Sequence, residues 1–194
     1  MNYKIYGLIA IIAIAIVACQ PTTKDSKNVE LTEMSQDEMA VKGKYLVSIL
    51  DCNICHTPKI FTPDGPVPDT SKTLSGHPAD FPEAPFDQAT VGAYTLANAH
   101  FSSWKGAFGT SYAANLTPDS TGLARWTEEN FINAIRKGKH LGMDQQRPIM
   151  PPMPWQAYRN LPDEDLKAIW AYLQSLPPIK NAVPVYMPPV QSKM

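Results

Sequence analysis

Residues Asp51-Cys-Asn-Ile-Cys-His-Thr-Pro58, or DCNICHTP, place two cysteines three positions apart and a histidine directly after the second one. The rest of the 194-residue chain has one more cysteine, Cys19, and three more histidines. Two thiols at this spacing can form a disulfide, bind a metal or be modified covalently. The sequence therefore concentrates its thiol and imidazole chemistry in one short segment.

Two common uses of a Cys-x-x-Cys pair fit this sequence poorly. A thioredoxin-type disulfide lies at a helix start after a strand, whereas the residues before Cys52 have a helical pattern. A structural zinc site requires four nitrogen or sulfur ligands, and His77, His100 and His140 are scattered, with no second ligand pair at short spacing. A haem-free thiol oxidoreductase is kept as an alternative function.

The remaining use is covalent attachment of c-type haem, for which Cys-x-x-Cys-His is the signature. One turn of backbone brings Cys52 and Cys55 to the two vinyl groups of the porphyrin, and His56 reaches the iron from the same face. We therefore expect one covalent haem c bound by these three residues. The second ring N–H of His56 should donate to a backbone carbonyl, from the region of Pro58.

The N-terminus indicates export. A basic start precedes an apolar run, Ile5–Val17, which has the length of a secretory signal and is too short to span a bilayer comfortably. The run ends in Ile16-Val17-Ala18-Cys19, which resembles a bacterial lipobox. We expect residues 1–18 to be a lipoprotein signal peptide, Cys19 to carry lipid, and residues 19–34 to be a polar tether.

Length and composition favour one globular domain behind this tether. Hydrophobic residues make up 44% of the chain and charged residues 18%, as in ordinary globular proteins. The net charge of -1 argues against nucleic acid as a partner. We expect a domain over residues 35–180, followed by a Pro-rich tail over residues 181–194.

Four further motifs follow the haem motif: NLTPD at 115–119, WTEE at 126–129, PPMPW at 151–155 and DEDLKAIWAYLQSLPP at 163–178. With these motifs the sequence resembles the class I cytochrome c family, and in particular the monohaem modules of cytochrome subunits of membrane-bound alcohol and sugar-acid dehydrogenases. The resemblance covers residues 38–56 and 115–178, roughly half of the chain.

This resemblance implies an all-α, cytochrome c-like fold and an electron carrier rather than an enzyme. It also implies respiratory redox partners, a dehydrogenase or an oxidase, one of which could hold the chain as a subunit. Together with the lipobox, it implies a lipid-anchored protein of the bacterial cell envelope that faces the periplasm.

The first predicted helix leads directly to the haem motif. Ser35-Gln-Asp-Glu38 is a capping box, and Met39, Gly43, Leu46 and Leu50 follow at helical spacing. Gly43 is unfavourable in a helix and therefore suggests a close helix contact. In the family, the first helix crosses the last helix at such a point.

Two further helices are predicted near the C-terminus. One has Thr127 as its N-cap, runs to Lys137 and stops at Gly138. The other begins around Pro162 or Asp163 and is ended by Pro177.

Residues 57–114 interrupt the helical pattern. They contain seven prolines and five glycines in 58 positions, a density that forbids long helices. We expect an ordered, Pro/Gly-rich loop insertion that is held by packing and either wraps an edge of the haem or builds a docking face.

The second axial ligand of the iron separates an electron carrier from a haem enzyme. Met153 lies in Pro151-Pro152-Met153-Pro154, a stiff strap that loses little entropy on ordering, and the family places its methionine in a Met-Pro-aromatic pattern. We expect His56/Met153 ligation and electron transfer by Fe(II)/Fe(III) cycling. A haem enzyme or sensor with an open sixth position, such as a peroxidase, is the alternative. The other candidate ligands are Met143, Met150, Met187, His77, His100 and His140.

Overall fold

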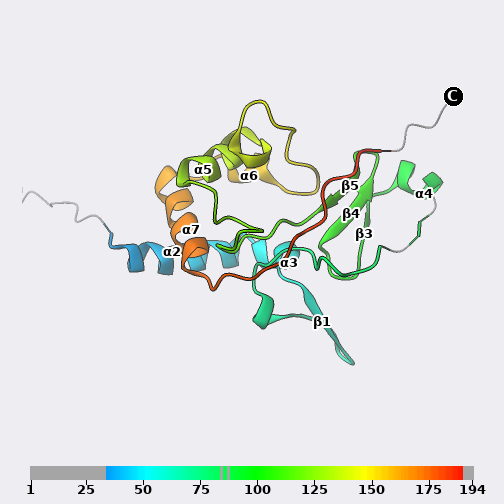
Figure 1. The fold of residues 1–194 in the computed structure, drawn as a ribbon, viewed down its shortest axis with the longest axis horizontal. Coiled ribbons are helices and arrows are strands. Elements are labelled where there is room, and N and C mark those ends of the chain that lie inside the picture. Colours follow the sequence, from blue (N-terminus) through cyan, green and yellow to red (C-terminus); the bar gives the residue numbers. More distant parts are fainter. Residues whose placement is uncertain (1–33, 84, 87, 190–194) are drawn as a thin grey trace, which may run out of the picture. The chain divides into compact units, whose positions relative to one another are not determined.

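Three helices, α2 (Gln36–Ile49), α5 (Glu128–Lys137) and α7 (Asp163–Ser175), supply most of the hydrophobic core (Figure 1), to which Leu74 and Leu123 also belong. They belong to a computed structural model that describes residues 34–189, except residues 84 and 87. The signal peptide, Cys19 and nearly all of the tether lie outside the described residues. Within this described part, no helix combines the length and the apolar character needed to cross a membrane.

Helix α2 begins at the predicted capping box and packs along α7. The amide of Glu38 donates to Ser35 Oγ at 3.3 Å, and the Glu38 carboxylate accepts from the Ser35 amide at 2.8 Å. A Cβ atom placed on Gly43 would lie 1.9 Å from the carbonyl oxygen of Ala168 in α7, so the two helix backbones touch. The close contact predicted at Gly43 is therefore confirmed.

Helices α5 and α7 complete the core at the predicted positions. Thr127 caps α5, and Gly138 ends it in the left-handed conformation, with φ at 63°. The buried apolar side chains of the two helices are Phe131, Ala134, Ile135, Leu166, Ala168, Ile169 and Leu173. Each large one stabilises the fold by about 1.5–3 kcal/mol relative to an exposed position.

The insertion, residues 57–114, contains two antiparallel sheets, so the prediction of an all-α fold was wrong. The first sheet pairs β1 (Lys59–Thr62) with β2 (Gly65–Pro68), and the second has the order β3 (Leu96–Ala97), β4 (Ser103–Gly106) and β5 (Gly109–Tyr112). Prolines are tolerated in β2 because it pairs on one side only. The remaining short elements are α3 (Cys52–His56), η1 (Thr70–Lys72), α4 (Gln88–Ala93), η2 (His140–Gly142) and α6 (Trp155–Tyr158).

After α7 the chain returns along the insertion, as the red end of the ribbon in Figure 1 shows. The side chain of Asn181 binds the backbone of residues 75–79, and Met187 exchanges two backbone hydrogen bonds with Thr110, at 2.8 and 3.0 Å. The C-terminal segment, residues 176–189, therefore joins the helical core to the second sheet.

Candidate haem site

Helix α3 carries both cysteines and the histidine of the motif on five consecutive residues. Helix α2 is capped by Leu50, and Asp51 turns the chain in the left-handed conformation, with φ at 56°. Aspartate tolerates this conformation better than most residues do. Cys52 and Cys55 are half-buried free thiols, so both sulfurs are available for thioether bonds.

The C-terminal end of α3 is held by a lysine. Lys59 Nζ donates to the carbonyl oxygens of Asn53, Ile54 and Thr57, at 3.2, 2.9 and 2.5 Å. A cation at a helix C-terminus satisfies carbonyls that have no partner within the helix and interacts favourably with the helix dipole. Burial lowers the pKa of Lys59. The motif is thus fixed by bonds that do not depend on the cofactor.

The imidazole of His56 is oriented by one backbone hydrogen bond. Its Nδ1 lies 2.8 Å from the carbonyl oxygen of Ala114, to which it donates. This corrects the expectation that the acceptor belongs to the Pro58 region. Among the described residues, Nε2 makes no hydrogen bond, so this tautomer leaves its lone pair for iron. Burial lowers the pKa of His56, which favours the neutral form that binds metal.

Ala114 is brought to His56 by two neighbouring backbone segments. Residues 74–77 run beside residues 113–116 and exchange backbone hydrogen bonds with them, while the Gly76 amide donates to the His56 carbonyl at 2.7 Å. Gly76 has φ at +84°, and a Cβ there would lie 2.6 Å from the carbonyl carbon of Ala114. Only glycine permits this approach. The pairing joins distant segments, and no local pattern identified it.

The pKa values of the two thiols are shifted in the opposite direction to those of redox-active cysteines. Burial raises the pKa of Cys52 to about 11 and also raises the pKa of Cys55. Thiol oxidoreductases require a lowered thiol pKa, because the thiolate is the nucleophile. The site therefore disfavours the haem-free thiol oxidoreductase.

Met153 packs against the same apolar cluster as Cys52 of the motif. It is half-buried and packs against the helical core, as do Cys52, Leu116, Trp126 and Leu161. The Trp155 amide donates to the Met153 carbonyl at 2.9 Å, which fixes the strap at the start of α6. A pocket of about 280 Å³ is lined by Ile149 and residues 151–156.

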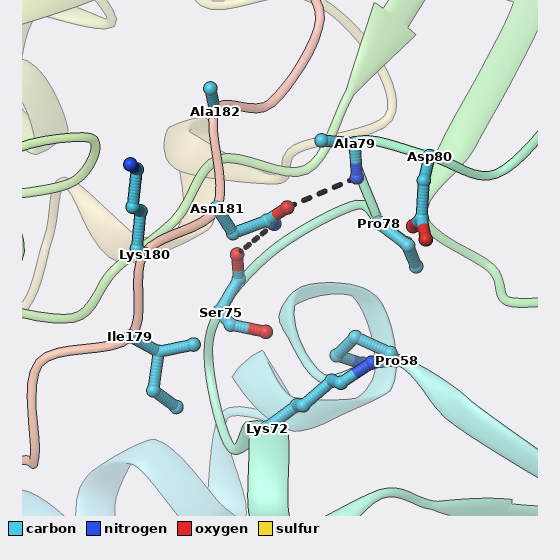
Figure 2. Close-up of a pocket in the computed structure, with 10 residues that line it drawn as sticks. All are labelled: Pro58, Lys72, Ser75, Pro78, Ala79, Asp80, Ile179, Lys180, Asn181 and Ala182. Carbon is cyan, nitrogen blue, oxygen red and sulfur yellow. Dashed lines mark hydrogen bonds between the residues drawn. The ribbon is translucent and has the colours of Figure 1, made fainter.

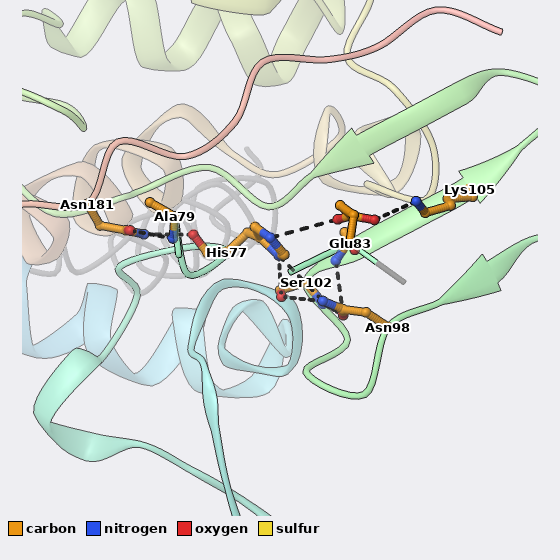
Figure 3. Close-up of polar contacts among 8 residues, drawn as sticks. His77, Ala79, Glu83, Asn98, Ser102, Lys105 and Asn181 are labelled. Carbon is orange, nitrogen blue, oxygen red and sulfur yellow. Dashed lines mark hydrogen bonds and ion pairs between the residues drawn. The ribbon is translucent and has the colours of Figure 1, made fainter. Parts of the chain in front are cut away.

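Other candidate ligands have different surroundings. Met143 and Met187 are 46% and 44% exposed. His77 is fully buried in the insertion, where its Nδ1 lies 3.0 Å from Ser102 Oγ (Figure 3). Nδ1 of His100 accepts from the Lys59 amide at 3.0 Å. The two histidines are therefore already engaged within the insertion.

A second pocket, of about 370 Å³, lies between Pro58 and the C-terminal segment (Figure 2). Lys72, Asp80 and Lys180 contribute opposite charges to its lining. Figure 2 shows that the amide of Asn181 is used for bonds to the backbone of Ser75 and Ala79. The pocket contains none of the predicted haem-binding residues, so we do not assign the cofactor to it.

Comparison with known proteins identifies the family of the C-terminal part. Residues 100–177 match the cytochrome c family. The chain is 40% identical over 78 residues to a nicotinate dehydrogenase subunit of Pseudomonas putida, a match that covers 40% of this chain and 6% of that protein. It is 28% identical over 135 residues to the fructose dehydrogenase cytochrome subunit of Gluconobacter japonicus, covering 69% of the chain and 20% of the relative.

A third relative also matches most of this chain with only a small part of its own length. The match to the gluconate 2-dehydrogenase cytochrome c subunit of Pantoea cypripedii is 26% identical over 152 residues and covers 77% of the chain and 26% of the relative. The chain thus spans at most about a quarter of the length of these three relatives.

Proposed function

We propose that this chain is a class I c-type cytochrome, an electron carrier with covalently bound haem c, and that Cys52, Cys55, His56 and Met153 hold that haem. The observation that carries the proposal is the bond from His56 Nδ1 to the Ala114 carbonyl. It fixes the ring and leaves Nε2 free, beside two free thiols on the same short helix.

Met153 is the sixth ligand in this proposal. Its partial burial against the core that also contacts Cys52 supports the assignment over the exposed Met143 and Met187. A thioether is a weak iron ligand, so the protein must hold the sulfur in place. The prolines at 151, 152 and 154 restrict the backbone on both sides of Met153 and reduce the entropy lost when the strap orders.

A haem held by His56 and Met153 would serve one-electron transfer. Bound haem supplies the Fe(II)/Fe(III) couple, and a methionine opposite a histidine raises the reduction potential. The bond that orients His56 and the prolines beside Met153 would hold both ligands in place, and two such ligands would leave no coordination position for a substrate.

We extend the proposal to the location and the partner of the chain. Lipid on Cys19 anchors the protein to a bacterial membrane, and residues 19–34 let the haem domain reach a neighbour on the periplasmic side. A membrane-bound dehydrogenase is the proposed electron donor, because relatives of this chain are cytochrome subunits of dehydrogenases. Copurification from native membranes tests this partnership.

Covalent attachment has a direct test. The protein is exported together with a haem maturation system, boiled in detergent and separated by electrophoresis. Haem staining should follow the polypeptide and should be lost in the Cys52→Ala/Cys55→Ala double variant. A colourless wild-type band contradicts the proposal.

The sixth ligand is tested by absorption spectroscopy. The ferric protein should show the far-red band of methionine-ligated haem, and the band should disappear in Met153→Ala. Met143→Ala is the matched control, because this exposed methionine should leave the band unchanged. Tight carbon monoxide binding by the unmodified ferrous protein would instead support an enzyme or sensor with an open sixth position.

A further inference from the structure

The strap that carries Met153 is tied to the insertion by a hydroxyl group. Ser111 lies on β5 and is 7% exposed, and its Oγ donates to the carbonyl oxygen of Pro151 at 2.6 Å. This acceptor lies two residues before Met153. The bond therefore joins the second sheet to the strap at a position close to the proposed iron ligand.

The chemistry of the strap limits the hydrogen bonds that can hold it. Pro151, Pro152 and Pro154 have no amide hydrogen, so they cannot donate hydrogen bonds that would anchor this stretch. Only their carbonyl oxygens can be bound. The Pro154 carbonyl accepts from the Ala157 amide at 3.0 Å within α6, whereas the Pro151 carbonyl accepts from a side chain outside the strap. Ser111 provides that donor from the insertion.

A second contact holds the other end of the same loop. The guanidinium of Arg147 lies 5.1 Å from the ring centroid of Tyr186 in the C-terminal segment. Tyr186 is fixed in turn, because its hydroxyl donates to the Phe108 carbonyl at 2.6 Å, in the turn between β4 and β5. A cation over an aromatic face is attracted by the negative potential of the ring face. The bond from Ser111 and the stacking of Arg147 on Tyr186 thus both connect the loop at residues 147–154 with the hairpin of β4 and β5.

We propose that this hairpin braces the sixth-ligand loop from outside, with Ser111 as the positioning residue for Met153. The inference rests on the proposed ligation by Met153 and assigns a role to the insertion. A weak ligand dissociates whenever its loop opens, and each bond that holds the loop closed lowers the population of the open form. The brace would therefore set the fraction of molecules in which the Met153 sulfur has left the haem iron.

Imidazole, added as an external iron ligand, measures the open population. It binds ferric haem only after Met153 has left, so its apparent affinity is its intrinsic affinity multiplied by the open fraction. Ser111→Ala should increase the apparent affinity about five- to tenfold, as expected for one lost hydrogen bond. Arg147→Gln should increase it about threefold. Circular dichroism and haem content verify that each variant folds.

Two serine variants serve as controls. Ser103 lies on β4, opposite Tyr112 of β5, and makes no hydrogen bond to the strap among the described residues. The imidazole affinity of Ser103→Ala should therefore equal that of the wild type. Ser111→Thr keeps the hydroxyl and should restore the wild-type affinity. Equal imidazole affinities for Ser111→Ala and Ser103→Ala would overturn the brace. If Ser111→Ala fails to fold, an unchanged affinity in Arg147→Gln overturns it.

A double-mutant cycle separates this inference from the proposed ligation. Met153→Ala should bind imidazole far more tightly, and Ser111→Ala should have no further effect in that background. If Met153→Ala leaves the affinity unchanged, the ligand assignment is wrong. If Met153→Ala raises the affinity and Ser111→Ala alone does not, the ligand assignment holds and the brace is wrong.

Discussion

Helices α2 and α7 meet through apolar side chains and a bare backbone contact at Gly43, whereas the insertion is joined to the rest of the chain by hydrogen bonds between distant residues. Asn181 alone makes three such bonds to residues 75–79. Apolar burial is non-directional and tolerates small shifts, while a buried hydrogen bond requires its partner in place. The helical core should therefore respond to changes in volume, and the insertion to single lost polar groups.

The largest effect is expected from Gly43→Ala. The new Cβ would lie 1.9 Å from the Ala168 carbonyl oxygen, and neither helix backbone can move without separating α2 from α7. We expect the free energy of unfolding to fall by about 3 kcal/mol or more, measured by denaturant titration of the haem-loaded protein.

Gly92→Ala is the matched control for this change. Gly92 lies in α4 of the insertion, and a Cβ built there meets no heavy atom within 4 Å apart from its chain neighbours and its own helix backbone. Alanine is a better helix former than glycine, so stability should stay the same or rise slightly. Similar losses in both variants would contradict the assignment of the close contact to Gly43.

Asn181→Ala should have the next largest effect and should act on the insertion. Its amide donates to the carbonyls of Ser75 and His77, at 2.7 and 2.8 Å, and accepts from the Ala79 amide at 3.0 Å. Leaving these groups without a partner should cost about 2–3 kcal/mol. Hydrogen exchange of residues 74–79 should accelerate while exchange in α2 and α7 stays slow.

Asn160→Ala is the control for this experiment. Asn160 is exposed and its side chain makes one long hydrogen bond, of 3.5 Å, to the Gln156 carbonyl, so loss of this bond should change stability little. A uniform increase of exchange across the whole chain in Asn181→Ala would show that the insertion does not open separately from the helical core.

The difference between the helical core and the insertion also explains which features the sequence could predict. The capping box at Ser35, the N-cap at Thr127 and the stop at Gly138 are local signals, and the helices begin and end there. The acceptor for His56 lies in a different segment from the predicted one, because Ala114 reaches the ring through backbone pairing of residues 74–77 with 113–116. Such pairing has no local signature.

The sheets of the insertion had signals that could have been used. Pro63-Asp64-Gly65 is a recognised turn sequence and lies at the bend between β1 and β2. Strands of four residues, however, are too short for a convincing alternation of polar and apolar residues. High proline and glycine content correctly excludes long helices, but it does not exclude short strands.

Protonation of His77, which lies in the insertion, should make the free energy of unfolding depend on pH. The side chain is fully buried, with Nε2 3.9 Å from Glu83, which also pairs with Lys105 (Figure 3). Burial lowers the pKa of His77 despite Glu83. Below about pH 6.5 the unfolded chain binds a proton that the folded chain does not, so stability falls as the pH drops towards the folded pKa.

Above about pH 6.5 this contribution is constant, because His77 is neutral in both states. One such group accounts for a slope of at most about 1.4 kcal/mol per pH unit. His77→Gln should reduce the slope below about pH 6.5 in unfolding titrations of the haem-loaded protein. An unchanged slope would mean that His77 does not contribute to acid sensitivity.

The smallest effect is expected at Tyr158, which ties α6 to the turn before the haem cysteines. Its hydroxyl donates to the Leu50 carbonyl at 2.6 Å, and burial raises the pKa of Tyr158 to about 12, so the donor is present at all ordinary pH values. Tyr158→Phe should cost about 1 kcal/mol. Tyr45→Phe is the control, because Tyr45 is 64% exposed, and it should be neutral.

Tyr158→Phe also allows the hydrogen bonds of Tyr158 and Ser111 to be compared as supports of the strap. Tyr158 fixes the strap from within the helical core, four residues after Pro154, whereas Ser111 fixes it from the insertion. Because Tyr158 binds through α6 and not through the proline stretch itself, Tyr158→Phe should lower overall stability while changing imidazole affinity less than Ser111→Ala does. The reverse order would assign control of the iron ligand to the helical core, and the insertion would then contribute only to folding.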